Sequence, residues 1–307
     1  MISIICPFYN EEQMVPLFFT ELFNAISTID DEIEVICIND GSSDQTLQKI
    51  IEQKQTTPAN VKIRILDLSR NFGKEAALTA GIDHALGDAV IPIDTDLQDP
   101  PQLITELVKK WQEGFEVVLA KRCDRSSDLW LKRKTAEWFY KIHNNISTSS
   151  IPENVGDFRL LNRAAVEALK QLPERERFMK GLFNWVGFKT AQIEYTRTGR
   201  KAGESKFAMI KLWNFALDGI TSFSTVPLKI WSYLGFFISF FAFTYGSIII
   251  ARTLIYGIDI PGYASLLVVM LFLGGLQLIG IGVLGEYLGR IYIETKNRPI
   301  YIIRQEL

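Results

Sequence analysis

Two aspartates placed two residues apart are the first point at which this sequence suggests chemistry. Asp94 and Asp96 follow an apolar segment, residues 89–93, that predicts a buried strand. Both carboxylates can reach one space past the strand end, where they repel each other unless a cation joins them. Mg²⁺ or Mn²⁺ binds carboxylates together with substrate phosphate oxygens, and Gln98 offers a further neutral oxygen. An isolated Asp-x-Asp is more often an acidic turn, but the whole string 91–101 after a strand favours a metal site.

The segments around this string predict the element order that positions it. Apolar segments alternate with helical patterns, which indicates an α/β fold with a mostly parallel sheet. The expected strands are 2–6, 34–38, 61–68, 89–93, 115–120 and 187–195. Ligands of such sheets bind beyond the carboxyl ends of the strands. Polar clusters follow these ends, and we expect them to form one site: residues 9–12, Asp40, 70–74, 94–98 and 121–122.

Composition and absent motifs exclude several classes of protein. The formal net charge of −2 gives no general attraction to nucleic acid. After the first strand there is no Gly-x-Gly-x-x-Gly, and the chain contains no Gly-x-x-x-x-Gly-Lys-Ser/Thr and no Gly-x-Ser-x-Gly, so a dinucleotide-binding Rossmann domain, a P-loop ATPase and a nucleophile elbow are not supported. Cys6, Cys37 and Cys123 are far apart in the sequence, and we expect them to be reduced core residues in a cytosolic compartment.

Two long uncharged segments lie near the end of the chain. No charged residue occurs between Lys229 and Arg252, or between Asp259 and Glu286. About 20 apolar residues cross a bilayer as a helix, so two transmembrane helices are predicted, and a buried globular hairpin is the weaker alternative. Basic residues flank the pair on both sides, which places the α/β domain and both termini in the cytoplasm. Those residues are Arg197, Arg200, Lys201, Lys206, Lys211, Lys229, Arg290, Lys296, Arg298 and Arg304.

The segments 130–146 and 207–227 mix aromatic and apolar residues with a few charges. Both are expected to be helices; the second reads as a helix lying at the membrane interface, and the first fits the membrane surface and an ordinary amphipathic surface helix equally well. The predicted organisation is a cytosolic domain at 1–205, interfacial helices at 206–229, two transmembrane helices at 230–288 and a cytosolic tail at 289–307.

Several of these motifs together resemble a known family. The sequences Pro7-Phe8-Tyr9-Asn10-Glu11-Glu12, Asn39-Asp40-Gly41-Ser42-Ser43-Asp44, Asn71-Phe72-Gly73-Lys74 and Asp94-Thr95-Asp96-Leu97-Gln98-Asp99-Pro100-Pro101 resemble GT-A glycosyltransferases of family 2, in the dolichol-phosphate mannose synthase-like branch. The sequence Arg200-x-x-Gly203-x-Ser205-Lys206 before two apolar spans is similar to bacterial undecaprenyl-phosphate (bactoprenol) glucosyltransferases. The resemblance covers essentially the whole chain.

This resemblance implies inverting transfer of one sugar, glucose from UDP-glucose, to polyprenyl phosphate at the plasma membrane, with Mg²⁺ or Mn²⁺. It implies Asp157 as the catalytic residue and Asp94, Asp96 and Gln98 as the metal site. Arg122 and Arg133 are expected to hold the acceptor phosphate. The implied donor-binding residues are Pro7, Tyr9, Glu11, Asp40, Asn71, Lys74, Asp94, Thr95, Arg200, Ser205 and Lys206.

The chemistry of the acceptor leaves the role of Asp157 open. A phosphate monoester has a second pKa of about 6, so the acceptor is already mostly dianionic at neutral pH. Asp157 therefore removes a residual proton or only orients the attack. For Arg200 and Lys206, a basic clamp on the donor diphosphate and a solvated basic loop are both compatible with the sequence.

Other functions fit parts of the same pattern. The donor is not decided by sequence, so GDP-mannose, an aminosugar nucleotide or an aminoarabinose nucleotide remain alternatives. A catalytically inactive, membrane-anchored binding protein is the non-enzyme alternative, and a transporter is third. The absence of Gln-x-x-Arg-Trp, a mark of processive synthases in the family it resembles, favours a single transfer. The oligomeric state is open, since glycines such as Gly274 and Gly282 would let membrane helices approach closely.

Overall fold

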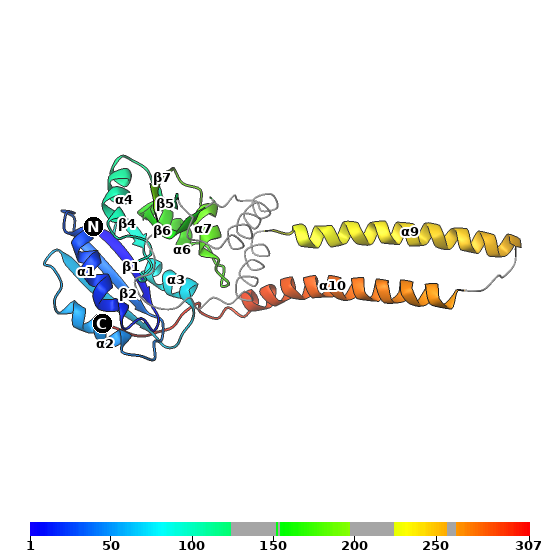
Figure 1. The fold of residues 1–307 in the computed structure, drawn as a ribbon, viewed down its shortest axis with the longest axis horizontal. Helices are drawn as coiled ribbons and strands as arrows, with labels where there is room; N and C mark the ends of the chain where they lie inside the picture. Colours follow the sequence, from blue (N-terminus) through cyan, green and yellow to red (C-terminus); the bar gives the residue numbers. More distant parts are fainter. Residues whose placement is uncertain (124–151, 153, 197–223, 257–261) are drawn as a thin grey trace.

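The chain forms an α/β domain from which a two-helix hairpin projects (Figure 1). The computed structural model describes residues 1–123, 152, 154–196, 224–256 and 262–307. The strands are β1 (Ile2–Phe8), β2 (Ile33–Asn39), β3 (Val61–Leu68), β4 (Ala89–Pro92), β5 (Val117–Arg122), β6 (Val155–Asn162), β7 (Thr190–Tyr195) and β8 (Ile303–Glu306). The helices are α1 (Met14–Ile26), α2 (Thr46–Lys54), α3 (Lys74–His84), α4 (Leu103–Gln112), α6 (Arg163–Lys170), α7 (Met179–Trp185), α9 (Val226–Tyr256) and α10 (Tyr263–Thr295).

The described strands form one sheet in the order β7-β5-β6-β4-β1-β2-β3-β8. Strand β1 pairs in parallel with β2 and β4, β2 with β3, and β5 with β7. Strand β6 runs antiparallel to both β4 and β5, and β8 runs antiparallel to β3. The predicted α/β class with a mostly parallel sheet is confirmed. Strand β6, which was not among the predicted strands, separates β4 from β5.

Both faces of the sheet are buried, which explains the continuous apolar runs of its central strands. Residues of β1 alternate between two cores: Ile4 and Phe8 join the core beneath α1 and α4, and Ile5 joins the core beneath α3 and α6. Cys6 and Cys37 are buried cross-strand neighbours, and burial raises the pKa of both thiols. The expectation that all three cysteines are core residues is wrong for Cys123, which is exposed just after the end of β5.

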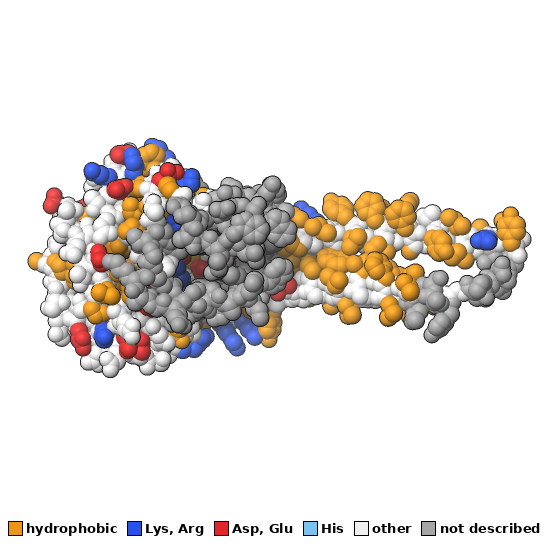
Figure 2. Space-filling view, viewed as in Figure 1, with side chains coloured by type: hydrophobic (Ala, Val, Ile, Leu, Met, Phe, Trp, Pro, Cys, Tyr) orange, Lys and Arg blue, Asp and Glu red, His pale blue; other side chains and the backbone are white. Residues whose placement is uncertain are grey.

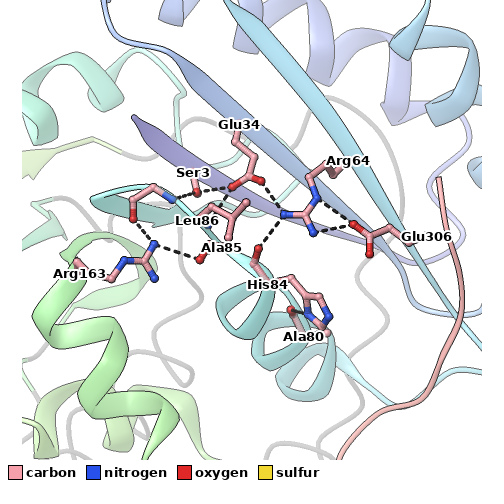
Figure 3. Close-up of polar contacts among 10 residues, drawn as sticks. Ser3, Glu34, Arg64, Ala80, His84, Ala85, Leu86, Arg163 and Glu306 are labelled. Carbon is pink, nitrogen blue, oxygen red and sulfur yellow. Dashed lines mark hydrogen bonds and ion pairs between the residues drawn. The ribbon is translucent and has the colours of Figure 1, made fainter.

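A buried carboxylate organises the edge of the sheet at which β1, β2 and β4 begin (Figure 3). Glu34 accepts hydrogen bonds from Ser3 Oγ at 2.6 Å, from Leu86 N at 3.1 Å and from Arg64 Nη1 at 2.7 Å. Arg64 also donates to Glu306 Oε1 at 2.6 Å and to the carbonyl oxygen of His84 at 2.9 Å. One guanidinium group therefore joins β2, β3, the end of α3 and the end of the chain.

The end of the chain belongs to the sheet. Residues 289–307 were predicted to be a cytosolic tail, yet β8 pairs with the outer edge of β3, and Ile65 and Leu307 exchange backbone hydrogen bonds at 2.9 Å. Tyr301 Oη donates to Asp83 Oδ2 at 2.9 Å, which ties the same segment to α3. The hairpin therefore leaves the domain before α9 and returns to it after α10.

Helices α9 and α10 are long and apolar enough to cross a membrane. The candidate spans are Val226–Tyr256, with mean hydropathy 1.9, and Val268–Thr295, with mean hydropathy 2.2, and neither is buried inside the protein. Hydrophobic side chains cover the visible face of the hairpin, whereas charged side chains gather on the domain (Figure 2). The predicted helix at 130–146 lies outside the described residues, as do residues 207–223 of the predicted helix at 207–227; residues 226–227 of the latter begin α9.

Candidate active site at the carboxyl edge of the sheet

The predicted site residues that the structure describes lie at one edge of the sheet. Most of them lie at the carboxyl end of a strand or in the loop that follows it. Asp157 instead lies near the start of β6, which begins at this edge because it runs in the opposite direction. The residues are Pro7, Tyr9, Glu11, Asp40, Asn71, Lys74, Asp94, Thr95, Asp96, Gln98, Arg122 and Asp157. The predicted residues Arg133, Arg200, Ser205 and Lys206 lie outside the described residues.

Lys74 lies at the centre of this edge and joins two of its carboxylates. It is the first residue of α3, and its Nζ is 2.7 Å from Asp94 Oδ1, 2.9 Å from Asp94 Oδ2 and 2.7 Å from Asp157 Oδ2. Burial by itself would lower the pKa of Lys74, but the charges of Asp157 and Asp94 outweigh it and raise that pKa above its ordinary value. Lys74 therefore remains a cation that connects the acidic string after β4 to the start of β6.

Asp157 is a buried carboxylate surrounded by cations. Burial opposes its ionisation, yet Lys74, Lys180 and Arg159 together hold its pKa below the ordinary aspartate value. Its Oδ1 is buried and has no hydrogen-bond partner among the residues that the structure describes. Buried polar atoms without a partner are rare in folded proteins and call for an explanation. An ionised carboxylate with one oxygen held by Lys74 and the other unsatisfied is suited to receive a polar group of a bound substrate.

Three cations lie near Asp157. Lys74 contacts the carboxylate directly, and Lys180 and Arg159 are close by. Arg159, two residues further along β6, donates to the carbonyl oxygen of Gly156 at 2.6 Å and lies over the Phe183 ring, with its Cζ 4.2 Å from the ring centroid. The alternating pattern of β6, had it been identified as a strand, would have placed Asp157 and Arg159 on the same face.

Glu75 is a second carboxylate that the sequence motifs did not identify. Its Oε2 accepts a hydrogen bond from the backbone N of Met179, the first residue of α7, at 3.0 Å. Burial, together with the charge of Asp157, raises the pKa of Glu75 to about 7. One indication in the sequence that Glu75 belongs to the site is its position next to Lys74. Its contact with Met179 could not be predicted, because the two residues are 104 positions apart.

The acidic string after β4 has the oxygen donors that a hard divalent cation requires. Asp94 and Asp96 offer carboxylates and Gln98 an amide oxygen, and Gln98 N donates to Asp96 Oδ1 at 3.1 Å. Burial raises the pKa of Asp94, and Lys74 acts against this increase. The described residues contain no cluster of three or more His, Cys, Asp or Glu side chains able to hold a metal alone. Two carboxylates and one amide oxygen are donors of the kind that Mg²⁺ or Mn²⁺ binds together with substrate phosphates.

Asp40 ties the loop after β2 to the loop after β3. Its two carboxylate oxygens accept from Phe72 N at 2.7 Å and from Gly73 N at 3.0 Å. Gly41 makes this approach feasible, because an added Cβ would lie 2.3 Å from the carbonyl carbon of Arg70 and its φ of +62° favours glycine. Asp40 thus shapes the loop that leads to Lys74; binding of a nucleoside by the same carboxylate stays a prediction.

Arg122 is the described member of the predicted phosphate-binding pair. Its Nε donates to Tyr195 Oη at 3.0 Å, its Nη2 is 3.5 Å from Asp99 Oδ1, and Tyr195 Oη donates to Asp99. This arrangement connects β5, β7 and the acidic string, and Asp99 and Tyr195 were not identified from sequence. The guanidinium also lies against the start of β6, since a Cβ added to Gly156 would be 3.1 Å from Arg122 Nη2.

The loop after β1 closes the remaining side of the site. Glu11 N donates to Thr46 Oγ1 at 2.9 Å, and Asn10 N donates to Ser42 Oγ at 3.1 Å, so this loop rests on the loop after β2. Thr95 Oγ1 donates to the carbonyl oxygen of Pro7 at 3.3 Å. The side chain of Tyr9 is 44% exposed and is available for contact with a ligand.

Comparison with known proteins identifies relatives along the whole chain. A family model described as "Glycosyl transferase family 2" matches residues 3–170. The chain is 57% identical over 305 residues to the "Bactoprenol glucosyl transferase" of Shigella phage SfV, covering 99% of this chain and 98% of the relative. It is 56% identical over 304 residues to the "Prophage bactoprenol glucosyl transferase homolog" of Escherichia coli K12, covering 99% and 98% of the two chains.

Solved structures of glycosyltransferases show a more distant likeness. Glucosyl-3-phosphoglycerate synthase from Mycobacterium tuberculosis has a TM-score of 0.46 and 20% sequence identity, with 72% of this chain and 78% of that chain covered. A mannosyltransferase from Pyrobaculum calidifontis, in complex with GDP-Man and Mn²⁺, has a TM-score of 0.45 and 17% identity, with 63% and 54% covered.

Proposed function

The chain belongs to glycosyl transferase family 2, and from this premise we propose that it transfers one glucose from UDP-glucose to polyprenyl phosphate in a membrane. The choice of glucose and of a bactoprenol acceptor is supported by relatives named bactoprenol glucosyl transferase, which align over nearly the full chain. The observation that carries the proposal is the contact of Lys74 with both Asp94 and Asp157. Through this contact the acidic string that contains Asp94, which suits a nucleotide diphosphate, lies beside the buried and ionised carboxylate of Asp157.

Each described residue has a proposed task in this reaction. Asp96 and Gln98, with Asp94 beside them, would hold a divalent cation, which when bound offsets the negative charge of the nucleotide diphosphate leaving group. Asp157 would accept a hydrogen bond through Oδ1 from the hydroxyl of the monoanionic acceptor phosphate, which orients the acceptor, and would then take that residual proton. Its negative charge would repel a dianionic phosphate, and Lys74 and Arg122 supply compensating positive charge at the same edge. Tyr9, Glu11 and Asn71 would contact the donor.

The hairpin supports a location at the plasma membrane. The segment after α10 belongs to the domain, since β8 pairs with β3, and Ser224, two residues before α9, accepts a hydrogen bond from Tyr287 in the last third of α10. A hairpin that crosses the bilayer twice therefore leaves the domain and the C-terminus on one side. The basic residues near both ends favour the cytoplasmic side by the positive-inside rule.

The direct test is transfer by the purified full chain in detergent with polyprenyl phosphate and Mg²⁺. Radiolabelled UDP-glucose is expected to label the lipid, whereas GDP-mannose, UDP-N-acetylglucosamine and an aminoarabinose nucleotide are expected to label it far less. Preferential labelling by another donor would identify a different sugar. Absence of transfer from every donor, with nucleotide binding retained, would favour the inactive binding protein.

The position of Arg122 against Gly156 gives a prediction about the acceptor. In Gly156→Ala the new Cβ would lie 3.1 Å from Arg122 Nη2, so the guanidinium must shift by a few tenths of an ångström. We expect the KM for polyprenyl phosphate to rise about tenfold, equivalent to about 1.4 kcal/mol, while the KM for the donor stays unchanged. The control is Gly289→Ala in α10, where an added Cβ meets nothing within 4 Å. An unchanged acceptor KM in Gly156→Ala would remove Arg122 from the phosphate site.

A further inference from the structure

The end of α10 is clamped to the loop between α6 and α7. Glu294 Oε1 accepts from the backbone N of Arg175 at 2.8 Å and from that of Glu176 at 3.4 Å. Arg290, one turn earlier in α10, is 3.1 Å from Glu176 Oε2, and Arg175 Nη2 donates to Asn297 Oδ1 at 2.7 Å. The backbone amides and the side chains of Arg175 and Glu176 are thus bound by residues at the end of α10 or just after it.

The loop itself is braced internally. Arg177 Nη2 donates to the carbonyl oxygen of Leu172 at 2.7 Å, and its Nε donates to that of Glu174 at 3.1 Å. These bonds hold both ends of the 172–177 segment together. A displacement of the segment at Arg175 is therefore transmitted to Met179, where α7 begins.

The other side of this loop reaches the active site. The backbone N of Met179 donates to Glu75 Oε2 at 3.0 Å, and Glu75 is adjacent to Lys74, which holds Asp94 and Asp157. Continuous contacts therefore run from Glu294 through the 172–177 segment and α7 to the first turn of α3. The far end of α3 is held as well, because Asp83 accepts from Tyr301 Oη in the segment that follows α10.

A lipid acceptor makes this arrangement useful. The phosphate of a polyprenyl chain stays at a limited range of depths at the membrane surface, so the catalytic carboxylate must be held at a matching height. A soluble acceptor can approach the site from any depth, so transfer to it does not require this match in height. Residues that set the height of the site should therefore affect transfer to a membrane-embedded acceptor much more than transfer to a soluble acceptor.

We propose that Glu294 is a positioning residue: by binding the amides of Arg175 and Glu176, it fixes the height of the Lys74–Asp157 pair relative to the membrane hairpin and so aligns the site with a lipid-borne phosphate. The proposal rests on the proposed transfer to polyprenyl phosphate. It assigns Glu294 no contact with substrate.

The test compares Glu294→Ala, Glu294→Gln and a control, Glu52→Ala, in the full chain in lipid nanodiscs. Glu52 is an exposed glutamate of α2, a helix that takes no part in the contacts around Glu294 described above. Transfer is measured to a long-chain polyprenyl phosphate in the bilayer and to a short, water-soluble prenyl phosphate. Amide hydrogen exchange at Arg175 and Glu176 is measured in parallel as a readout independent of activity.

Glu294→Ala is expected to lower kcat/KM for the long-chain acceptor about tenfold, to leave the short acceptor within about twofold, and to increase exchange at both amides. Glu294→Gln keeps an acceptor oxygen and should recover most of the loss, and Glu52→Ala should resemble the wild type. An equal loss with both acceptors, or no loss with either, overturns the positioning role. If the wild type transfers glucose to neither acceptor, the proposed function is wrong. Unchanged amide exchange at Arg175 and Glu176 in Glu294→Ala would separately show that Glu294 does not hold these amides.

Discussion

Asp157→Asn is expected to lower kcat by about 100- to 10,000-fold, the range that general-base assistance contributes in enzymes. The substitution replaces the charged carboxylate, which Lys74 contacts at 2.7 Å, with a neutral amide that has one acceptor oxygen and one NH2 donor group. It therefore removes both orientation of the acceptor and acceptance of its residual proton. Donor affinity should stay nearly unchanged, because Asp157 is not part of the acidic string after β4.

The pH dependence separates the two contributions of Asp157. Its surrounding cations hold its pKa below the ordinary value, so Asp157 stays ionised throughout the neutral and mildly acidic range. A fall in wild-type kcat below about pH 6 would therefore come from protonation of the acceptor phosphate rather than of Asp157. We expect Asp157→Asn to lose activity at every pH and to lose most at low pH, where the residual proton must still be removed.

The measurement is kcat between about pH 5.5 and 8.5, combined with donor binding by calorimetry. Asp88→Asn is the control, since Asp88 is an exposed aspartate that pairs with the N-terminal amine at the opposite edge of the sheet. Full recovery of the Asp157→Asn rate at high pH would restrict Asp157 to proton removal. A loss of donor affinity as large as the loss of rate would make Asp157 a ligand of the donor sugar.

Asp96→Ala is expected to abolish metal-dependent donor binding and to lower kcat/KM at least 100-fold. Both oxygens of Asp94 contact Lys74, so we assign Asp96 as the principal carboxylate ligand. A cation that neutralises a diphosphate leaving group contributes several kcal/mol to transition-state stabilisation, and each 1.4 kcal/mol corresponds to about tenfold in rate. Losing the principal ligand should therefore cost two or more orders of magnitude.

Calorimetric titration of UDP-glucose with and without Mn²⁺ measures this directly. The wild type should bind the donor more tightly with the metal, and Asp96→Ala should show equal, weak binding in both conditions. Asp88→Ala controls for the loss of an aspartate elsewhere. Full wild-type activity in excess EDTA would show that the reaction needs no divalent cation, and would remove the metal from the mechanism.

The sequence by itself predicted those features that depend on residues close together in the chain. The acidic string 94–98 could be interpreted because its donors are consecutive and follow a strand. The central strands and the two membrane helices were predicted because apolar periodicity and the length of uncharged segments are local properties. The edge of the sheet that carries the candidate site could also be predicted, because ligands of a parallel sheet bind beyond the carboxyl ends of its strands.

The tertiary structure decided which of these groups meet. Lys74 and Asp157 are 83 residues apart, Asp99 and Tyr195 are 96 apart, and Arg64 and Glu306 are 242 apart. Such contacts depend on the order and direction of strands, above all on β6 running against its neighbours and so bringing Asp157 to the carboxyl edge. Strand β8 shows the same dependence: its residues pair with β3 only because the hairpin returns the chain to the domain. Strand order is set by packing over the whole domain, and the local pattern of residues carries no direct record of it.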